Sequence, residues 1–396
     1  MSEWQTFCLK DLGKIVGGAT PSTNNPKNYG NKIAWITPKD LSTLQGRYIK
    51  KGSRSISRLG FKSCSCVLLP KHAILFSSRA PIGYVAIAKK RLCTNQGFKS
   101  IIPNKKIYFE FLYYLLKYHK DNISNIGGGT TFKEVSGATL GLFKVKIPPT
   151  YCEQQKIART LSILDQKIEN NHKINELLHK ILELLYEQYF VRFDFLDENN
   201  KPYQTSGGKM KFSKELNRLI PSGWSVRFLN HKIVSTYQPK TISKTLLNDS
   251  YSYSVYGGGG IIGRFTEYNH EQSEFIISCR GQCGISYLTL PKSWITGNAM
   301  VIRPTKSYTS KTYLYHTINK YKLTNYITGS VQPQITRQNL STMPILIPKR
   351  KTLNKWNNIS SLLWNLIHNN MQSTQTLTAL RDFLLPLLLK QQVKPQ

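Results

Sequence analysis

The sequence is short of acidic residues. It has 21 Asp and Glu against 55 Lys and Arg in 396 residues, which gives a formal net charge of +34. Such an excess favours a polyanionic partner, above all nucleic acid, over a general basic bias that keeps a protein soluble. Because 40% of the residues are hydrophobic and 11% aromatic, the chain can bury cores, so we expect the charge on folded domains and not on a disordered tail.

Long apolar runs and cysteines are also scarce. The longest apolar run, residues 383–389, contains Pro386 and is far shorter than the ~20 residues of a membrane-spanning helix. The seven cysteines are odd in number and scattered, which indicates reduced thiols and not a disulfide framework. The first residues show no apolar core followed by a cleavage site. We therefore expect a cytoplasmic protein.

Sequence motifs typical of catalysis are missing. The glycine runs at residues 127–129 and 257–260 are not followed by the Lys-Ser/Thr of a phosphate loop. The pairs Cys64/Cys66 and Cys279/Cys283 lack a second pair with metal-binding spacing. The sequence thus predicts no catalytic residue and no metal site, and the chemistry that remains is that of binding.

Internal repetition is the strongest pattern in the chain. Residues 129–148 align without gaps with residues 329–348. Earlier matches in the same order place Arg79 with Arg280 and Trp4 with Trp224. Several ordered matches at offsets near 200 residues indicate a duplication. Each copy has short β-rich runs punctuated by Gly and Pro around one helical patch, which predicts a compact mixed α/β module.

The positive charge follows this duplication. Residues 1–150 carry a net charge of +18 and residues 221–348 carry +9, whereas residues 151–190 carry −1. We predict two recognition modules, 1–150 and 221–348, with helical segments at 151–190 and 349–396 and a polar connector at 191–220. The last segment also includes the C-terminal tail.

Each copy ends in a long helical pattern. Apolar residues recur at spacings of four and three, which places them in one stripe along the helix. We call this stripe the seam, and asparagines lie near its middle in each helix. Helices of about 38 residues are too long to cover a small module, so we predict that they pair antiparallel as a coiled-coil spacer. Two separate amphipathic helices, each packed on its own module, are the alternative. The predicted packing residues are Ile157, Leu161, Leu164, Ile168, Asn171, Leu178, Leu182 and Leu185 in the first helix, and Ile359, Leu363, Leu366, Asn370, Leu377, Leu380 and Leu384 in the second.

Basic side chains near turns are the candidate nucleic-acid contacts. Clustered Lys and Arg suit phosphate oxygens, whereas Arg, Gln and Thr beside glycine-rich turns can reach base edges. Each residue taken singly can instead have an ordinary structural role. The candidates are Arg47, Lys50, Lys51, Arg54, Arg58, Lys62, Arg79, Lys89, Lys90, Arg91, Thr130 and Thr131 in the first module, and Arg264, Arg280, Gln332 and Gln334 in the second.

Several stretches resemble the specificity subunits of type I restriction-modification systems. LLPKHAILFSSRAPIGYVAIAK in the first copy is similar to one class of target-recognition domain, and YGGGGIIG, ISCRGQCG and GSVQPQI in the second are similar to another. IPPTYCEQQKIARTLSILDQKI resembles the entry to the family's helical spacer, and the second spacer lacks the equivalent of Glu153-Gln154. The resemblance covers nearly the whole chain.

This resemblance implies an α+β fold with two target-recognition domains on a helical spacer, and a subunit without catalytic activity of its own. Each domain would read one half of a bipartite, asymmetric DNA target. The partners would be double-stranded DNA, two modification (methyltransferase) subunits and restriction (motor and nuclease) subunits. S-adenosylmethionine, ATP and Mg would be bound by those subunits, and no cofactor by this chain.

Two other functions remain open from the sequence. One is a DNA methyltransferase or nuclease with an unrecognised active site. The only Pro-Pro, in residues 147–150, does not match the Asn/Asp-Pro-Pro-aromatic motif that such a methyltransferase needs. The other is an RNA-binding scaffold, which a comparison of duplex DNA with RNA at matched salt would distinguish.

Overall fold

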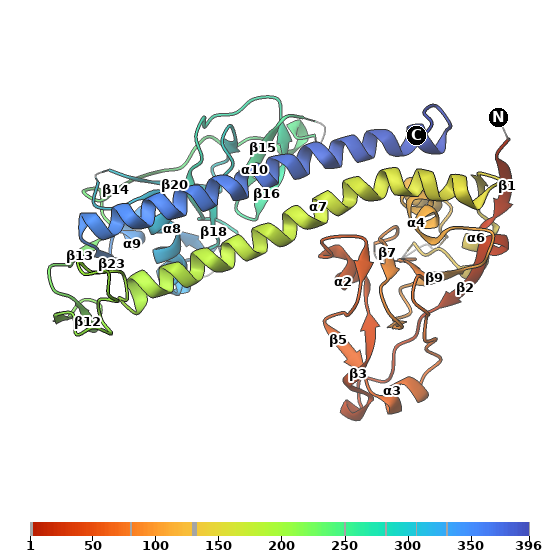
Figure 1. Cartoon of the computed structure of the whole chain (residues 1–396), viewed down its shortest axis with the longest axis horizontal. Coiled ribbons are helices and arrows are strands. Elements are labelled where there is room, and N and C mark those ends of the chain that lie inside the picture. Colours follow the sequence, from red (N-terminus) through yellow and green to blue (C-terminus); the bar gives the residue numbers. More distant parts are fainter. Residues whose placement is uncertain are drawn as a thin grey trace. The chain divides into compact units, whose positions relative to one another are not determined.

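The computed structural model describes residues 3–79, 81–128, 133–248, 251–281, 283–305, 307–329 and 332–395. The chain divides into two compact units. Unit 1 comprises Met1–Lys173 and Asn370–Gln396, and unit 2 comprises Ile174–Asn369. The two long helices α7 (Tyr151–Tyr186) and α10 (Arg350–Leu389) therefore each contribute to both units (Figure 1).

Unit 1 is built around a five-stranded sheet of order β2-β9-β6-β7-β4. A three-stranded sheet β5-β3-β8 and the antiparallel pair β1-β10 complete the module. The strands are β1 (Gln5–Cys8), β2 (Gly13–Gly17), β3 (Tyr29–Ile36), β4 (Tyr48–Ile49), β5 (Arg54–Ile56), β6 (Ile74–Phe76), β7 (Val85–Ala88), β8 (Cys93–Thr94), β9 (Lys99–Pro103) and β10 (Lys144–Ile147).

Short helices connect these strands, and one of them is central to the core. The helices are α1 (Leu9–Leu12), η1 (Pro26–Asn28), α2 (Pro38–Ser42), α3 (Arg58–Lys62), α4 (Phe109–Tyr118), α5 (Lys120–Asn125) and α6 (Gly137–Leu142). Six consecutive residues of α4, Phe111 to Leu116, are buried. Since α4 is buried on every side, it joins the sheet residues Ile74 and Phe76 to Ile157 and Leu161 of α7 in one core.

Unit 2 repeats this plan. Its four-stranded sheet β14-β20-β17-β18 and three-stranded sheet β16-β15-β19 lie beside the antiparallel pair β13-β23. The strands of unit 2 are β11 (Met210–Ser213), β12 (Arg218–Pro221), β13 (Ser225–Phe228), β14 (Val234–Tyr237), β15 (Tyr253–Gly257), β16 (Gly260–Phe265), β17 (Phe275–Ser278), β18 (Ser286–Leu288), β19 (Trp294–Ile295), β20 (Ala299–Pro304), β21 (Ile327–Thr328), β22 (Gln334–Ile335) and β23 (Pro344–Ile347). Its shorter helices are η2 (Glu187–Val191), η3 (Lys244–Leu246), α8 (Lys311–Asn319), η4 (Leu323–Tyr326) and α9 (Arg337–Leu340).

The main sheets of the two units correspond, although unit 1 has a fifth strand, β4, and unit 2 has the additional pairs β11-β12 and β21-β22. The order β14-β20-β17-β18 corresponds to β2-β9-β6-β7, and in both three-stranded sheets the middle strand pairs antiparallel with one neighbour and parallel with the other. The terminal pairs have the same register, with Gln5 opposite Ile147 and Ser225 opposite Ile347. The predicted duplication and the α+β fold class are therefore confirmed.

Within each unit, the segments of α7 and α10 run antiparallel. In unit 1, Asn171 Nδ2 donates to the Asn370 carbonyl at 3.4 Å and to Thr374 Oγ1 at 3.2 Å. In unit 2, Asn175 Nδ2 donates to the Ile367 carbonyl at 3.2 Å. Half-buried amides that bond across a helix seam disfavour shifted registers, because a shift would leave them unpaired.

The predicted seam positions of α7 are all buried or half-buried, whereas those of α10 are partly wrong. Ile157, Leu161, Ile168 and Leu182 are buried. In α10, however, Ile359, Leu366 and Leu380 are exposed, and the buried positions of its first half include Trp356, Ser360, Trp364 and Ile367. This part of α10 packs against both α7 and α8, and its two tryptophans fill the space between them, so the buried face is rotated away from the leucine seam. The remaining predicted positions are half-buried: Leu164, Asn171, Leu178, Leu185, Leu363, Asn370, Leu377 and Leu384.

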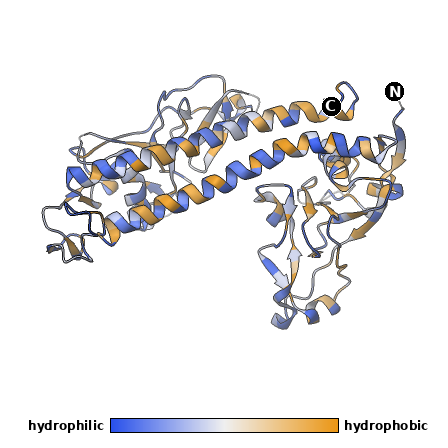
Figure 2. Cartoon of the chain, in the orientation of Figure 1, coloured by the Kyte–Doolittle hydropathy of each residue, from blue (hydrophilic) through white to orange (hydrophobic). Residues whose placement is uncertain are grey.

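Both long helices carry hydrophobic residues along their length (Figure 2). Charged and amide side chains interrupt these residues, and among the described residues no helix is long and apolar enough to cross a membrane.

Candidate nucleic-acid interface

A basic lobe on the first module contains five of the predicted contacts. Lys50, Lys51, Arg54, Arg58 and Lys62 are all exposed on or beside β5 and α3, and within the described ranges none of them forms an ion pair. Their charges are thus available to phosphate oxygens.

Local bonds hold this lobe in place. Ser57 caps α3 by accepting a hydrogen bond from the Gly60 amide at 3.0 Å, and its hydroxyl donates to the Lys27 carbonyl at 2.6 Å. A Cβ at Gly60 would lie 2.0 Å from the Asn28 oxygen, so only glycine allows α3 to approach this closely. Lys89, Lys90 and Arg91 form a second exposed cluster, after β7.

The remaining candidates lie at the ends of strands. In the second module Arg280, Gln332 and Gln334 are exposed, whereas Arg264 is half-buried and donates to the Ser252 carbonyl at 2.6 Å. In the first module Arg79 Nη1 lies 3.8 Å from Glu134 Oε2. Thr130 and Thr131 lie outside the described residues.

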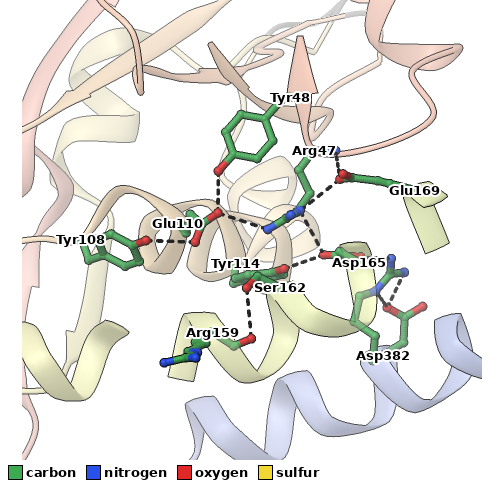
Figure 3. Close-up of polar contacts among 11 residues, drawn as sticks. Arg47, Tyr48, Tyr108, Glu110, Tyr114, Arg159, Ser162, Asp165, Glu169 and Asp382 are labelled. Atoms are coloured by element: carbon green, nitrogen blue, oxygen red, sulfur yellow. Dashed lines mark hydrogen bonds and ion pairs between the residues drawn. The ribbon is translucent and has the colours of Figure 1, made fainter. Parts of the chain in front are cut away.

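Arg47 is not a surface residue, and its predicted contact with DNA is wrong. It is 3% exposed, and its guanidinium lies among three carboxylates of unit 1 (Figure 3). Its Nη1 is 3.2 Å from Glu110 Oε1, and its Nε is 3.1 Å from Glu169 Oε1 and 4.0 Å from Asp165 Oδ2. The guanidinium is therefore buried against protein carboxylates and is not exposed to a phosphate.

The Arg47 cluster anchors the first module to the helices. Glu110 lies on α4, whereas Asp165 and Glu169 are one turn apart on α7. Asp165 also accepts from Tyr114 Oη at 2.6 Å and from Arg381 Nη1 at 2.8 Å, so α10 joins the same cluster. Burial by itself would lower the pKa of Arg47, but its carboxylate partners keep that pKa above its ordinary value.

Unit 2 has an uncharged cluster at the corresponding junction. His316 of α8 stacks on Tyr186, with ring centroids 5.6 Å apart, and lies edge-on to Trp356 at 5.3 Å. Burial, with the neighbouring His179 and Lys320, lowers the pKa of His316 to about 3. Burial likewise lowers the pKa of His368 to about 4. The second module is thus attached by neutral rings where the first is attached by ion pairs.

An exposed apolar face on the helix pair was not predicted from the sequence. In unit 2, α7 exposes Ile174, Leu177, Ile181 and Leu184, and α10 exposes Ile359, Leu362 and Leu366. We call these seven residues the helix apolar face. Leu177, Leu184 and Leu362 are 61%, 59% and 62% exposed, values typical of a surface that a partner covers. The signal in the sequence that could have identified this face is a second stripe of apolar residues, at spacings of three and four, beside the seam.

These features define a class of protein in which two duplicated basic modules are each built on segments of the same two long helices. The sequence matches the family described as "Type I restriction modification DNA specificity domain" over residues 1–180 and 221–380. The chain belongs to this family.

Two relatives agree with this assignment, and a solved structure agrees with the fold. The chain is 32% identical to the type I restriction enzyme MjaIX specificity subunit of Methanocaldococcus jannaschii, over 98% of this chain and 92% of that protein. It is 31% identical to the HindI specificity subunit of Haemophilus influenzae, over 46% of this chain and 40% of that one. The crystal structure of a type I S subunit from M. genitalium shares the fold, with a TM-score of 0.61 at 18% identity over 97% of this chain and 96% of that one.

Proposed function

We propose that the chain gives a type I restriction-modification enzyme its DNA specificity without catalysing a reaction itself. The first module, residues 1–150, reads one half of a bipartite, asymmetric target, and the second, residues 221–348, reads the other. The spacer helices hold the two modules. The observation that carries this proposal is that two equivalent modules, each rich in exposed basic residues, are built on the same helix pair.

The two halves of the target are expected to differ because the modules differ at their exposed basic positions. The first module has the basic lobe on β5 and α3, whereas the second has a glycine-rich hairpin, β15 to β16, at the corresponding place in the sheet. Side chains of different size and donor pattern select different bases. An asymmetric target follows from this difference.

The helix apolar face is the proposed dock for a modification subunit. The contacts between Asn175 and Ile367 and between Tyr186 and Trp356 set the register of the pair, so Leu177 lies level with Leu366 and Leu184 with Ile359. Burying aliphatic side chains that are about half exposed stabilises a complex by on the order of 1 kcal/mol each. The partner subunits would bring S-adenosylmethionine for methylation, and ATP and Mg for the motor and nuclease.

Sequencing of methylated DNA tests this function. The full chain is co-expressed with the modification subunit of its locus in a host without adenine methylation, and single-molecule sequencing records methylated adenines. The expected result is a split, asymmetric motif that disappears when this chain alone is omitted. Methylation that does not change on omission of the chain would contradict the proposal.

A further inference from the structure

Arg79 and Arg280 occupy equivalent places in the two modules. Each follows a buried strand of the main sheet and forms an isolated antiparallel bridge, Arg79 with Glu134 and Arg280 with Gln334. The backbone bonds around them also correspond: Ser78 N to Gly97 O (2.8 Å) and Val135 N to Ser78 O (2.9 Å) in the first module, and Cys279 N to Asn298 O (3.0 Å) and Ile335 N to Cys279 O (3.0 Å) in the second. The two side chains therefore begin from the same backbone position.

Their side-chain surroundings differ in charge. Glu134 pairs with Arg79 at 3.8 Å and with Lys99 at 3.4 Å. In the second module the bridge partner is the neutral amide Gln334, and Arg280 forms no ion pair within the described ranges. Arg280 is exposed, whereas Arg79 is half-buried. A carboxylate thus competes for the first guanidinium and not for the second.

The backbone of Arg280 is also held firmly. A Cβ at Gly258, in the turn between β15 and β16, would lie 2.8 Å from the Arg280 carbonyl oxygen. The glycine-rich hairpin therefore packs directly on this backbone, so binding by Arg280 orders its side chain without the further cost of ordering its backbone. The neighbouring Gln334 adds an amide of the kind that pairs with adenine.

We propose that Arg280 binds acceptor atoms of the target duplex, either a phosphate oxygen or the O6 and N7 of a guanine, and that Glu134 withholds the equivalent Arg79 from DNA. This inference rests on the proposed function, and it assigns unequal roles to two residues that the duplication makes equivalent. Arg and Gln on one bridge form a contact point in the second module. Arg79, Glu134 and Lys99 form an intramolecular ion cluster in the first.

The test measures DNA affinity of the full chain in complex with its modification subunit. The probe is a 40-base-pair random-sequence duplex, together with a duplex carrying the methylated motif. Arg280→Ala is expected to weaken binding about tenfold, since charge-assisted contacts are the strong ones. The matched variant Arg79→Ala is expected to lose clearly less DNA affinity than Arg280→Ala. Glu134→Gln is expected to strengthen binding about two- to fivefold, a gain that the double variant Arg79→Ala/Glu134→Gln should lose.

Two further measurements distinguish a phosphate acceptor from a guanine acceptor. A phosphate contact weakens binding to both duplexes and lowers the slope of log affinity against log salt by about 0.9. A guanine contact weakens binding to the motif duplex and relaxes one position in the half of the methylated motif that the second module reads. Either result supports the inference, provided that thermal melting shows the Arg280→Ala complex to be folded.

Equal losses of DNA affinity for Arg79→Ala and Arg280→Ala, or no loss for Arg280→Ala, would overturn the inference. The proposed function would still stand if the wild-type chain directs methylation of a split motif. If the wild-type complex binds neither duplex and methylates no motif, the proposed function fails as well. The two failures are therefore distinguishable.

Discussion

At the residue scale, the buried charges of unit 1 act in folding and not in DNA binding. Arg47 lies in a basic stretch of sequence, yet Glu110 on α4 and Glu169 on α7 enclose it. Removing one member of a buried ion cluster leaves the others unpaired in a medium of low dielectric constant. Its neighbours Lys50 and Lys51 are exposed and keep their charge for a partner.

Arg47→Ala is accordingly expected to lower the free energy of unfolding by about 3–5 kcal/mol, because Glu110 and Glu169 lose their partner. Urea denaturation followed by circular dichroism measures the change. Arg58→Ala, which removes an exposed arginine of the same module, should stay within about 0.5 kcal/mol of wild type and instead reduce DNA affinity. Equal denaturation midpoints for the two variants would contradict the anchoring role of Arg47.

The histidines of unit 2 predict acid sensitivity. The pKa of His316 is lowered to about 3 by burial and by its neighbours His179 and Lys320, so the folded state keeps this ring neutral below pH 6.5, where the unfolded state binds a proton. Stability is therefore lost as the pH falls below about 6.5, by about 2 kcal/mol at pH 5 for this group. Urea titrations at pH 7 and pH 5, followed by tryptophan fluorescence, measure the loss. His316→Gln should show a smaller difference between the two pH values, whereas the exposed His231→Gln should behave as wild type.

At the element scale, α7 has two apolar stripes with different tasks. Leu182 is fully buried and belongs to the packing of unit 2, whereas Leu177 belongs to the helix apolar face. The stripes are adjacent on the helix, and only their environments separate them. The same division explains α10, whose tryptophans take the packing positions and whose Leu362 remains exposed.

Substitution by aspartate should separate these tasks. Leu182→Asp places an uncompensated charge in the core and is expected to destabilise the chain by more than about 3 kcal/mol. Leu177→Asp should leave the unfolding curve of the chain unchanged but reduce the amount of modification subunit that co-purifies. Glu176→Ala, an exposed position of the same helix that is neither three nor four residues from any member of the helix apolar face on α7, serves as the control for both measurements. Normal co-purification with Leu177→Asp would count against the helix apolar face as the dock.

At the scale of the whole molecule, the duplication predicts independent modules. Replacing residues 221–348 by the corresponding module of a relative should change one half of the methylated motif and leave the other half intact. The module has its own sheets and core cluster, so these packing contacts are transferred together with the replaced residues. Single-molecule sequencing of host DNA provides the measurement, and a change in both halves of the motif would refute modularity.

Much of this architecture could be predicted from the sequence because its signals are local or periodic. The offset near 200 residues identified the two copies, and spacings of three and four identified both long helices. Charge counted by segment located the basic modules on either side of a neutral spacer. Patterns of this kind depend on the order of residues and need no knowledge of distant contacts.

Tertiary structure decided the properties that depend on contacts between residues distant in the sequence. Arg47 and Lys50 look alike in sequence, and only the approach of Glu110 and Glu169 buries one of them. Leu366 has the spacing of a seam residue, yet Trp364 and Ile367 take the buried positions because α8 packs against α10 as well as α7. The sequence by itself therefore determined the duplication, the fold class and the family. Which charges are buried, which leucines face solvent and which of two equivalent arginines has a carboxylate partner were settled by contacts between residues far apart in the chain.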